Sequence, residues 1–565
     1  MIRPRLFFQS LAIKVVDPLF LNRHPGHLLT AVIRGMGPLL RNLQPNDRWS
    51  LPAFAADWAL IVNQPSPPLQ GSAKSIFIFT CYRGQFTLDL IASLLLAWRG
   101  HWVVLGYFPK LRSPIKEPLR DSPGAQAYLH RILDPIEALT GGRVSCVDLT
   151  EHIGRAPVRD VAFLTRQIRS DVILKVHKER LDLDDPEVHS AFIYYEQVAT
   201  RAQSAAWSWF ETTSRRFDLC LIANGASFEA AQFLHVAKAR GIPVTTFEKF
   251  AFAKARTITH GAAFFNFDDL DVLLADGGRI GLNQPRIRRE LVDRAWRLLS
   301  QRHKSSGSAW GWQYQKNTRS LREDELLQCL NIKSNGFVLV CPNVPFDAGY
   351  DGWLAIFPSM RDWLTRTVEY LLRHTDMQVV VRAHPAECRP TFDREKVTDV
   401  LAEAGIASPN LVIIPGDSDI NTYDLMPLCS FAAVFASTTG VEIAMHEKPV
   451  IAGASVYYSR CGLTVPVTDA DTYFQQLDRL VTGEQFDCER KAEDAAIIYA
   501  LFHYYLQWPY PYDKPSQVAA LPPKSLGQSP RVAEYIRTLD SLAMTQSEFR
   551  EALPELIDLS KDYWT

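Results

Sequence analysis

Short apolar runs, rich in β-branched residues, alternate with helix-like spacers along most of the chain. They fall into two groups, one between residues 75 and 250 and one between residues 336 and 454. Strands that alternate with helical spacers are typical of βαβ units and parallel sheets. The pattern therefore predicts an α/β protein with two Rossmann-like domains. The predicted strands lie within 75–85, 98–108, 140–149, 217–227, 239–247, 336–347, 377–385, 431–440 and 446–454.

A polar stretch without an obvious period, "SQRHKSSGSAWGWQYQKN" at 300–317, separates the two groups. Such a stretch is typical of a domain junction, and a chain of 565 residues is too long for one ordinary core. A helical pattern resumes at 491–508 and stops at Pro509. The predicted parts are an N-terminal extension at 1–70, an N-terminal Rossmann-like domain at 71–320, a C-terminal one at 330–490, and C-terminal helices at 491–565 that pack back on the body.

The charges balance, with 61 basic and 62 acidic side chains, which argues against a nucleic acid as the main partner. The nine cysteines show no CxxC pair and no metal-type spacing, a pattern typical of reduced thiols in the cytosol. The longest lipid-like run, Leu90 to Trp98, is far too short for a membrane span. No signal peptide is expected at the start of the chain. These features predict a cytoplasmic protein.

Residues 1–50 are locally basic, with seven arginines or lysines against two aspartates. Apolar residues are mixed with these charges, so the segment fits an amphipathic surface that touches the anionic inner face of a membrane. It also fits an N-terminal helical extension that packs on its own domain. The sequence leaves both interpretations open.

The run "VVVRAHPAE", Val379 to Glu387, ends a predicted strand in polar residues. In open α/β sheets, ligands collect at the carboxyl ends of the strands. His384 can donate a hydrogen bond there or take up charge near pH 7, and Pro385 fixes the turn that directs it. Arg382 fits either a phosphate site or a surface ion pair. The alternative for His384 is a hydrogen-bonded structural residue.

A second polar stretch, "FASTTGVEIAMHEKPVIAG" at 435–453, follows another predicted strand. Backbone N–H groups at a helix start, together with the hydroxyls of Ser437, Thr438 and Thr439, form a suitable site for a phosphate. Gly440 permits a close approach. The hydroxyls also fit the capping of a helix. A parallel sheet that places this stretch beside the "VVVRAHP" strand end favours the phosphate site.

Together, "VVVRAHP" and the stretch at 424–464 resemble the C-terminal domain of bacterial capsule polysaccharide biosynthesis proteins. These proteins include Kdo transferases, and they share an HP motif with other GT-B glycosyltransferases such as the bacterial sialyltransferases. The resemblance is most specific over 335–465 and looser over 75–465. It implies a GT-B-like fold, in which two Rossmann-like domains face each other across a cleft, and a nucleotide sugar as the donor.

In those families the HP histidine and a hydroxyl pair ahead of a helix hold the phosphate of a CMP-linked sugar. By resemblance His384, Ser437 and Thr438 take these roles here, and Thr439 adjoins the pair. Glu442, one turn into the helix, is the expected contact of the ribose or of the helix start. Asn343, at the end of "FVLVCPN", is expected to face the donor unless it caps its own turn.

Glycosyl transfer to a hydroxyl needs a group that takes the acceptor proton and donors that neutralise the leaving phosphate. In the sialyltransferase relatives the base belongs to an acidic pair followed by glycine, but this chain reads "FEKF" at 247–250. Glu248 is the predicted base, and a structural salt bridge is its alternative role. Asn224 and Gly225, after "LCLIA", are predicted to line the acceptor side.

The adjacent acids Asp268 and Asp269 are interpreted as a solvated loop, because no Asp-x-Asp stands at a strand end; a divalent cation is the alternative. The "TCYRGQF" loop has no GxGxxG, which argues against a dinucleotide. We therefore expect no metal and no cofactor besides the nucleotide-sugar co-substrate. Positive charge is expected from His384, Arg382 and helix dipoles.

These features predict a metal-independent glycosyltransferase of surface or capsular polysaccharide biosynthesis. Its favoured donor is a CMP-linked acidic sugar such as Kdo or sialic acid, and its acceptor is a glycan or glycolipid. UDP and GDP sugars stay open, and so does the stereochemistry, because both outcomes occur on this fold. Two alternatives use the same phosphate site. One is transfer of a polyol phosphate from a CDP-linked donor, and the other is a non-catalytic scaffold that binds nucleotide sugars in capsule assembly.

Overall fold

The computed structural model describes residues 69, 72–112, 133, 136–138, 140–248, 255–305, 318–332, 336–389, 394–484, 486–509 and 537–560. The basic segment predicted to touch a membrane lies outside the described residues. The chain divides into two compact units. The first comprises Met1–His152, Thr213–Ala223 and Pro511–Ala543, and the second comprises Ile153–Thr212, Asn224–Tyr510 and Met544–Thr565.

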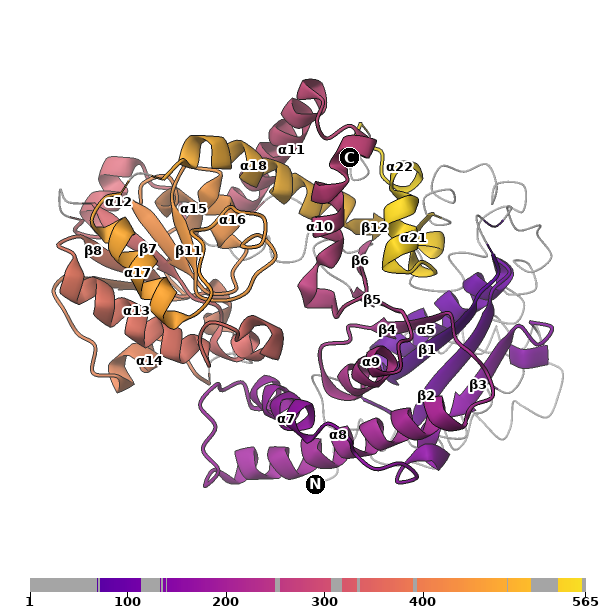
Figure 1. The fold of residues 1–565 in the computed structure, drawn as a ribbon. Coiled ribbons are helices and arrows are strands. Elements are labelled where there is room, and N and C mark those ends of the chain that lie inside the picture. Colours follow the sequence, from indigo (N-terminus) through magenta and orange to yellow (C-terminus); the bar gives the residue numbers. More distant parts are fainter. Residues whose placement is uncertain are drawn as a thin grey trace, which may run out of the picture. The chain divides into compact units, whose positions relative to one another are not determined.

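Seven strands form one sheet, in the order β12-β6-β5-β4-β1-β2-β3 (Figure 1). The strands β1 to β4 are parallel, whereas β6 runs antiparallel to both β5 and β12. Ile76, Phe77 and Ile78 of β1 are fully buried, as expected for a parallel strand covered on both faces. The bounds are β1 Ser75–Tyr82, β2 Trp102–Arg112, β3 Val144–Asp148, β4 Leu219–Ala223, β5 Val244–Glu248, β6 Ala255–His260 and β12 Gln507–Pro509.

Five parallel strands form the other sheet, in the order β11-β10-β7-β8-β9 (Figure 1). Numbered along the chain, this is the order 5-4-1-2-3 of a Rossmann half, whose direction reverses between β7 and β10. The two sheets confirm the predicted α/β class with two Rossmann-like folds. The bounds are β7 Phe337–Cys341, β8 Gln378–Arg382, β9 Leu411–Ile414, β10 Phe431–Val434 and β11 Val450–Ala452.

Helices connect the strands, and local sequence explains where several of them begin. Asp160, Ser359 and Asp469 each precede a helix, and each side chain accepts a hydrogen bond from its first turn. The bounds are α5 Arg83–Trp98, α7 Val161–Val176, α8 Pro186–Thr212, α9 Phe228–Ala239, α10 Asp268–Ala275, α11 Pro285–His303, α12 Glu323–Cys329, α13 Met360–His374, α14 Val397–Glu403, α15 Thr422–Leu425, α16 Thr439–Ala444, α17 Ala470–Val481, α18 Cys488–Ala500, α21 Gln546–Glu551 and α22 Leu553–Leu556.

The strands β6, β9 and β12 were not predicted from the apolar pattern. β12 lies in the region where helices were expected, and it pairs with β6 at the edge of the sheet. Just before it, α18 packs against α11 and α16. The chain after residue 490 thus contributes both a helix and a strand to the second unit.

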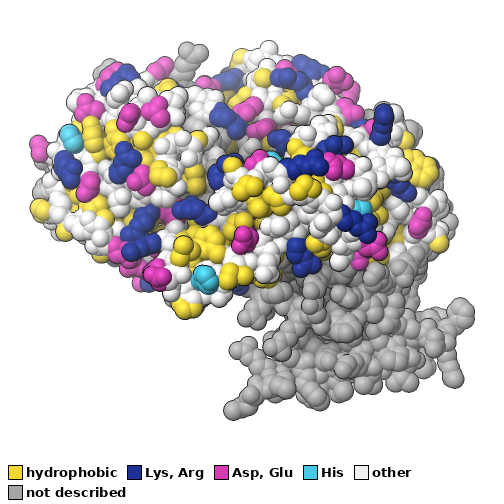
Figure 2. All heavy atoms as spheres, turned by 60° about the horizontal axis from the view of Figure 1, so that its bottom comes forward, with side chains coloured by type: hydrophobic (Ala, Val, Ile, Leu, Met, Phe, Trp, Pro, Cys, Tyr) yellow, Lys and Arg dark blue, Asp and Glu magenta, His cyan; other side chains and the backbone are white. Residues whose placement is uncertain are grey.

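No helix in the described part of the chain is long and apolar enough to cross a membrane. Figure 2 shows one face of the molecule, where Lys and Arg side chains are interspersed with Asp and Glu. The mixed charges on this face agree with the near-equal numbers of basic and acidic residues in the sequence.

Candidate functional site

The carboxyl ends of three neighbouring strands, β10, β7 and β8, lead into the segments singled out by the sequence. Val434 of β10 pairs with Cys341 of β7, and Val340 of β7 pairs with Val381 of β8. The sequence placed β8 and β10 side by side, but β7 lies between them. The strand order reverses here, and in open α/β sheets such a point is where ligands bind.

The loop after β10 is joined to the loop after β7. The backbone N–H of Ala436 donates a hydrogen bond to Oδ1 of Asn343 over 2.9 Å. The Asn343 side chain therefore holds the neighbouring hydroxyl loop, Ser437 to Thr439, instead of capping its own turn. The structure thus brings two of the predicted donor-side segments together.

The hydroxyl loop is half-buried and has hydrogen bonds of its own. Ser437 Oγ accepts hydrogen bonds from the backbone N–H of Thr439 over 3.3 Å and from its hydroxyl over 2.7 Å. Thr438 stands at the start of α16, but its side chain makes no capping hydrogen bond. The Thr438 hydroxyl is thus not used to cap the helix, whereas the Ser437 hydroxyl accepts the N–H of Thr439, the first residue of α16, as in the capping alternative that the sequence left open.

Gly440 is required by packing inside the domain. A Cβ at this position would lie 2.4 Å from the hydroxyl oxygen of Tyr458. The same hydroxyl donates a hydrogen bond to the backbone carbonyl of Ser437. From the sequence, Gly440 was expected to permit the close approach of a ligand. In the structure, the space next to its Cα is occupied by the hydroxyl of Tyr458.

His384 follows β8 and lies half-buried at the start of a short helical turn. Its Nδ1 accepts a hydrogen bond from the backbone N–H of Ala386 over 3.1 Å, which leaves the proton of the neutral ring on Nε2. Burial lowers the pKa of His384 to about 4, and the charges of Arg382 and Arg389 act in the same direction. The ring is therefore neutral at pH 7, which corrects the expectation that it supplies positive charge. Its Nε2–H is a hydrogen-bond donor.

Arg382, the last residue of β8, is 2% exposed and makes hydrogen bonds within the protein. Its guanidinium donates to Thr422 Oγ1 over 3.1 Å and to the backbone carbonyls of Ala383, Pro415 and Ile420 over 3.0, 2.6 and 3.5 Å. These bonds hold the turn after β8 against the loop after β9. The structure shows these protein oxygens as the partners of Arg382, and its contact with the donor phosphate stays a prediction.

Glu442 of α16 is fully buried and belongs to a network beneath the hydroxyl loop. Its Oε1 lies 3.1 Å from a guanidinium nitrogen of Arg302. The same atom accepts hydrogen bonds from the hydroxyls of Tyr499 and Tyr423 over 3.0 and 3.4 Å. The structure shows these protein partners for the Glu442 carboxylate, and the contact with the ribose stays a prediction.

Glu387 is a residue of this region that the sequence analysis did not single out. It lies three residues after His384, it is 2% exposed, and its Oε2 accepts a hydrogen bond from the backbone N–H of Val397 over 3.3 Å. Burial raises the pKa of Glu387 to about 8, although the Val397 hydrogen bond acts in the opposite direction. The carboxyl group is thus protonated at pH 7. The signal in the sequence that could have identified Glu387 is its position directly after His384-Pro385-Ala386.

Glu387 is expected to make the stability of the fold depend on pH. Between pH 4.5 and about 8 the folded chain keeps a proton here that the unfolded chain has lost. The free energy of unfolding should therefore fall as the pH rises, by about 1.4 kcal/mol per pH unit from this group. A Glu387→Gln variant should lose this part of the slope in urea unfolding at several pH values. The exposed Glu447→Gln is the control, and a wild-type slope in Glu387→Gln would show that Glu387 is ionised at neutral pH.

Asn224 and Glu248, both predicted for the acceptor side, are in contact. Asn224 follows β4, Glu248 ends β5, and Asn224 Nδ2 donates a hydrogen bond to Glu248 Oε2 over 3.2 Å. Asn224 Oδ1 accepts a hydrogen bond from the backbone N–H of Ala226 over 2.9 Å. This second bond fixes the amide orientation, so the amide in turn orients the half-buried carboxylate.

The loop that contains Asn224 has an unusual backbone. Asn224, Gly225 and Phe228 have φ angles of 63°, 71° and 53°, in a region that residues other than glycine rarely adopt. A Cβ on Gly225 would also lie 2.9 Å from Cγ2 of Thr246. Such conformations persist where the surroundings enforce them, and they cluster at functional sites.

Comparisons with known proteins assign no sequence family. No family model and no curated protein matches this chain. Among solved structures, the β Kdo 2,4 transferase KpsC of Thermosulfurimonas dismutans covers 50% of this chain and 79% of its own, with 15% identity and a TM-score of 0.31. A UDP-N-acetylglucosamine 2-epimerase covers 77% of this chain and 96% of its own, with 12% identity and a TM-score of 0.24. CalG4, the calicheamicin glycosyltransferase, covers 81% of this chain and 100% of its own, with 12% identity and a TM-score of 0.24. The fold described above rests on the strand order and not on these similarities.

Asp268 and Asp269 begin α10, which corrects the interpretation of this pair as a solvated loop. Asp269 is fully buried, with Oδ2 at 2.8 Å from Nδ1 of His260. Asp268 lies 3.3 Å from Arg460. Both acids thus contact basic side chains of the protein. In the part of the chain that the structure describes, no group of three or more His, Cys, Asp or Glu is placed to hold a metal ion.

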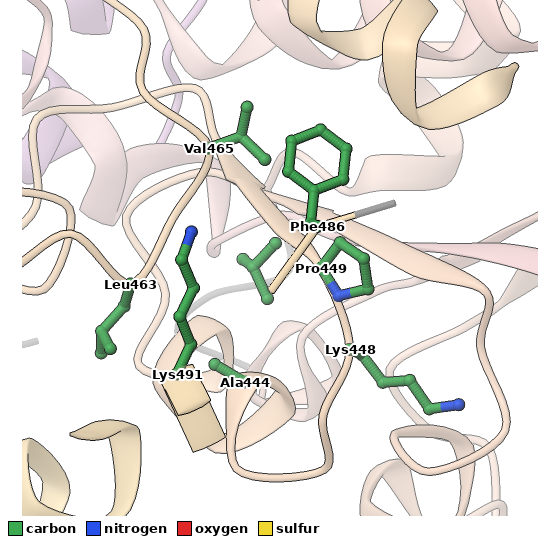
Figure 3. Close-up of a pocket in the computed structure, with 8 residues that line it drawn as sticks. Ala444, Lys448, Pro449, Leu463, Val465, Phe486 and Lys491 are labelled. Atoms are coloured by element: carbon green, nitrogen blue, oxygen red, sulfur yellow. The ribbon is translucent and has the colours of Figure 1, made fainter. Parts of the chain in front are cut away.

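A small pocket lies away from the strand ends described above. Its lining includes Lys448, Val450, Phe486 and Lys491. Val450 begins β11, so the pocket is at the amino end of this strand, opposite to the hydroxyl loop. Figure 3 shows the Lys448 side chain directed away from that of Lys491, so the two ammonium groups do not converge on one point. This pocket is therefore separate from the candidate site.

Proposed function

We propose that this chain is a glycosyltransferase that moves a sugar from a nucleotide donor to a glycan or glycolipid acceptor of surface polysaccharide. The favoured donor is a CMP-linked acidic sugar, and no metal takes part. The main support is the set of polar groups at the neighbouring ends of β10, β7 and β8. There a neutral imidazole that donates from Nε2 and a loop of hydroxyls fixed by Asn343 flank the point of strand reversal.

On the donor side, these groups suit a phosphate that gains negative charge as the sugar leaves. The Nε2–H of His384 and the hydroxyls of Ser437 and Thr438 would donate hydrogen bonds to the phosphate oxygens. Hydrogen bonds placed where charge develops stabilise the transition state more than the ground state. Because His384 is already neutral at pH 7, it gives this hydrogen bond without a change of its own charge.

On the acceptor side, Glu248 would act as the general base. The acceptor hydroxyl oxygen forms a bond to the anomeric carbon, and the bond from that carbon to the phosphate oxygen breaks. The hydroxyl proton passes to Glu248, and the electron pair of the broken bond leaves with CMP. The hydrogen bond from Asn224 holds the carboxylate in one orientation for this proton transfer.

A His384→Ala variant tests the donor site directly. A ligand that binds the folded state alone raises its apparent stability, so CMP should raise the melting temperature of the wild-type chain. The variant should bind CMP about 10- to 100-fold more weakly, because it loses a hydrogen bond to a charged phosphate. The measurement is a thermal-shift titration with CMP, CDP, UDP and GDP.

The exposed His374→Ala variant, in the same domain, serves as the control and should behave like the wild-type chain. A shift with CMP that is lost in His384→Ala supports the acidic-sugar donor, and consumption of CDP-glycerol would support polyol phosphate transfer instead. CMP binding without any transfer would point to the scaffold. Unchanged CMP affinity in His384→Ala would end the assignment of this residue to the phosphate.

A further inference from the structure

Two buried acids from one short segment of the chain cap helices elsewhere in the same unit. Asp171 of α7 is 1% exposed, and its Oδ1 accepts a hydrogen bond from the backbone N–H of Phe228 over 3.0 Å. Glu179, just after α7, is 3% exposed and accepts hydrogen bonds from the N–H groups of Met360 and Arg361 over 2.7 and 2.8 Å. Phe228 begins α9, and Met360 begins α13. The first N–H groups of a helix have no partner within the helix, and a carboxylate there is stabilising.

Each capped helix follows a loop of the candidate site. α9 follows the loop with Asn224, which orients the proposed base. α13 follows the segment that begins with Asn343, which holds the hydroxyl loop. The segment from Asp171 to Glu179 therefore holds the start of α9, which follows the Asn224 loop, and the start of α13, which follows the segment that begins with Asn343.

α7 makes a second contact with the loop from Asn224 to Phe228, which is called the strained loop here because of its positive φ angles. Nε2 of Gln167 donates to Oδ1 of Asp171 over 2.9 Å and to the backbone carbonyl of Ala226 over 3.2 Å. Ser227, directly before α9, makes no capping hydrogen bond with its side chain. Asp171 thus takes the place of a local cap, and it holds Phe228 in its positive-φ conformation.

α7 also packs against the loops that follow β7 and β8 on the donor side. Ile173 of α7 forms a buried cluster with Val344, Phe346 and Ala386. Val344 directly follows Asn343, and Ala386 donates the hydrogen bond that orients the His384 ring. A rotation or shift of α7 would therefore displace both donor-side loops.

We propose that the C-terminal part of α7, continued to Glu179, is a strut that couples the two sides of the site, with Asp171 and Glu179 as the positioning residues that join it to α9 and α13. Neither residue is placed to contact a substrate in this proposal. The catalytic consequence rests on the proposed function, but the mechanical coupling does not, since it follows from the hydrogen bonds and packing alone.

Hydrogen exchange on the full chain without ligand tests the coupling. Burial raises the pKa of Glu179 to about 7, so exchange is measured near pH 8, where the group is largely ionised. In Glu179→Ala, we expect about fivefold faster exchange in the first turn of α13, and also faster exchange at 224–230. Asp171→Ala should accelerate exchange at 224–230 and in the first turn of α13. Asp171→Asn, which keeps an acceptor oxygen, provides a second variant if Asp171→Ala does not fold.

The control is Asp469→Ala, which removes a cap from α17 within its own helix and should affect that helix alone. If each α7-region variant changes exchange in its own capped helix and nowhere else, the strut is overturned and the two acids are local caps. In a transfer assay, the strut predicts a lower kcat for Glu179→Ala with a near wild-type KM. If the wild-type chain transfers no sugar, the proposed function fails, but the exchange result still decides the strut.

Discussion

A Glu248→Gln variant is expected to transfer sugar about 10²- to 10⁴-fold more slowly than the wild-type chain, the range typical for loss of a general base. Gln has nearly the same shape, and its amide oxygen can still accept the hydrogen bond from Asn224, so the loop should keep its geometry. What the variant loses is the ability to take the acceptor proton. The measurement is CMP release at saturating donor and acceptor, and the KM for the donor should stay near the wild-type value.

The control for this experiment is Glu196→Gln, which makes the same change at an exposed position of α8. It should leave kcat unchanged. Full activity in Glu248→Gln, with normal CMP binding, would remove Glu248 as the base and leave the donor site intact. A loss of CMP binding would instead show that the variant disturbs the fold beyond the acceptor loop.

The strand ends of the candidate site could be predicted because their signals are local. A run such as Val379 to Val381 is buried on both faces of a parallel sheet, and the following His-Pro pair ends it. The same holds for the strand before Ser437. The position of β7 between these two strands could not be read from the sequence, since strand order depends on contacts between distant segments.

The roles of Arg382 and Glu442 show where local reasoning fails. The sequence identifies a charged side chain near a strand end, but it does not say which group accepts or donates its hydrogen bonds. Arg382 donates to carbonyls of the loop after β9, and Glu442 pairs with Arg302 in the last turn of α11. Both partners lie far from these residues in the sequence, so no spacing rule connects them.

The missed strand β12 has a different cause. Pro509 lies within it, and proline usually argues against a strand because it has no N–H to donate. β12 is the edge strand of its sheet, and an edge strand tolerates a proline whose missing N–H would face away from the neighbouring strand. The exception depends on the position in the sheet, which the sequence does not reveal.

The Arg302–Glu442 pair is the buried interaction with the largest expected effect on stability. Glu442 is fully buried, and the Arg302 side chain is 17% exposed. An isolated charge in such surroundings is costly, and loss of one partner leaves the other without compensation. Glu442 also lies in the helix that directly follows the hydroxyl loop, so its loss should disturb the donor site as well.

A Glu442→Ala variant should therefore lower the free energy of unfolding by about 3–5 kcal/mol, measured by urea unfolding. A double variant, Glu442→Leu with Arg302→Met, should lose less than Glu442→Ala because it removes both charges and fills the space. The control is Glu187→Ala, which breaks the exposed pair with Arg394 and should cost about 1 kcal/mol or less. If Glu442→Ala costs no more than Glu187→Ala, Arg302 is well solvated without its partner. The network beneath the hydroxyl loop then does not support that loop, and its geometry has to come from the Asn343 and Tyr458 hydrogen bonds alone.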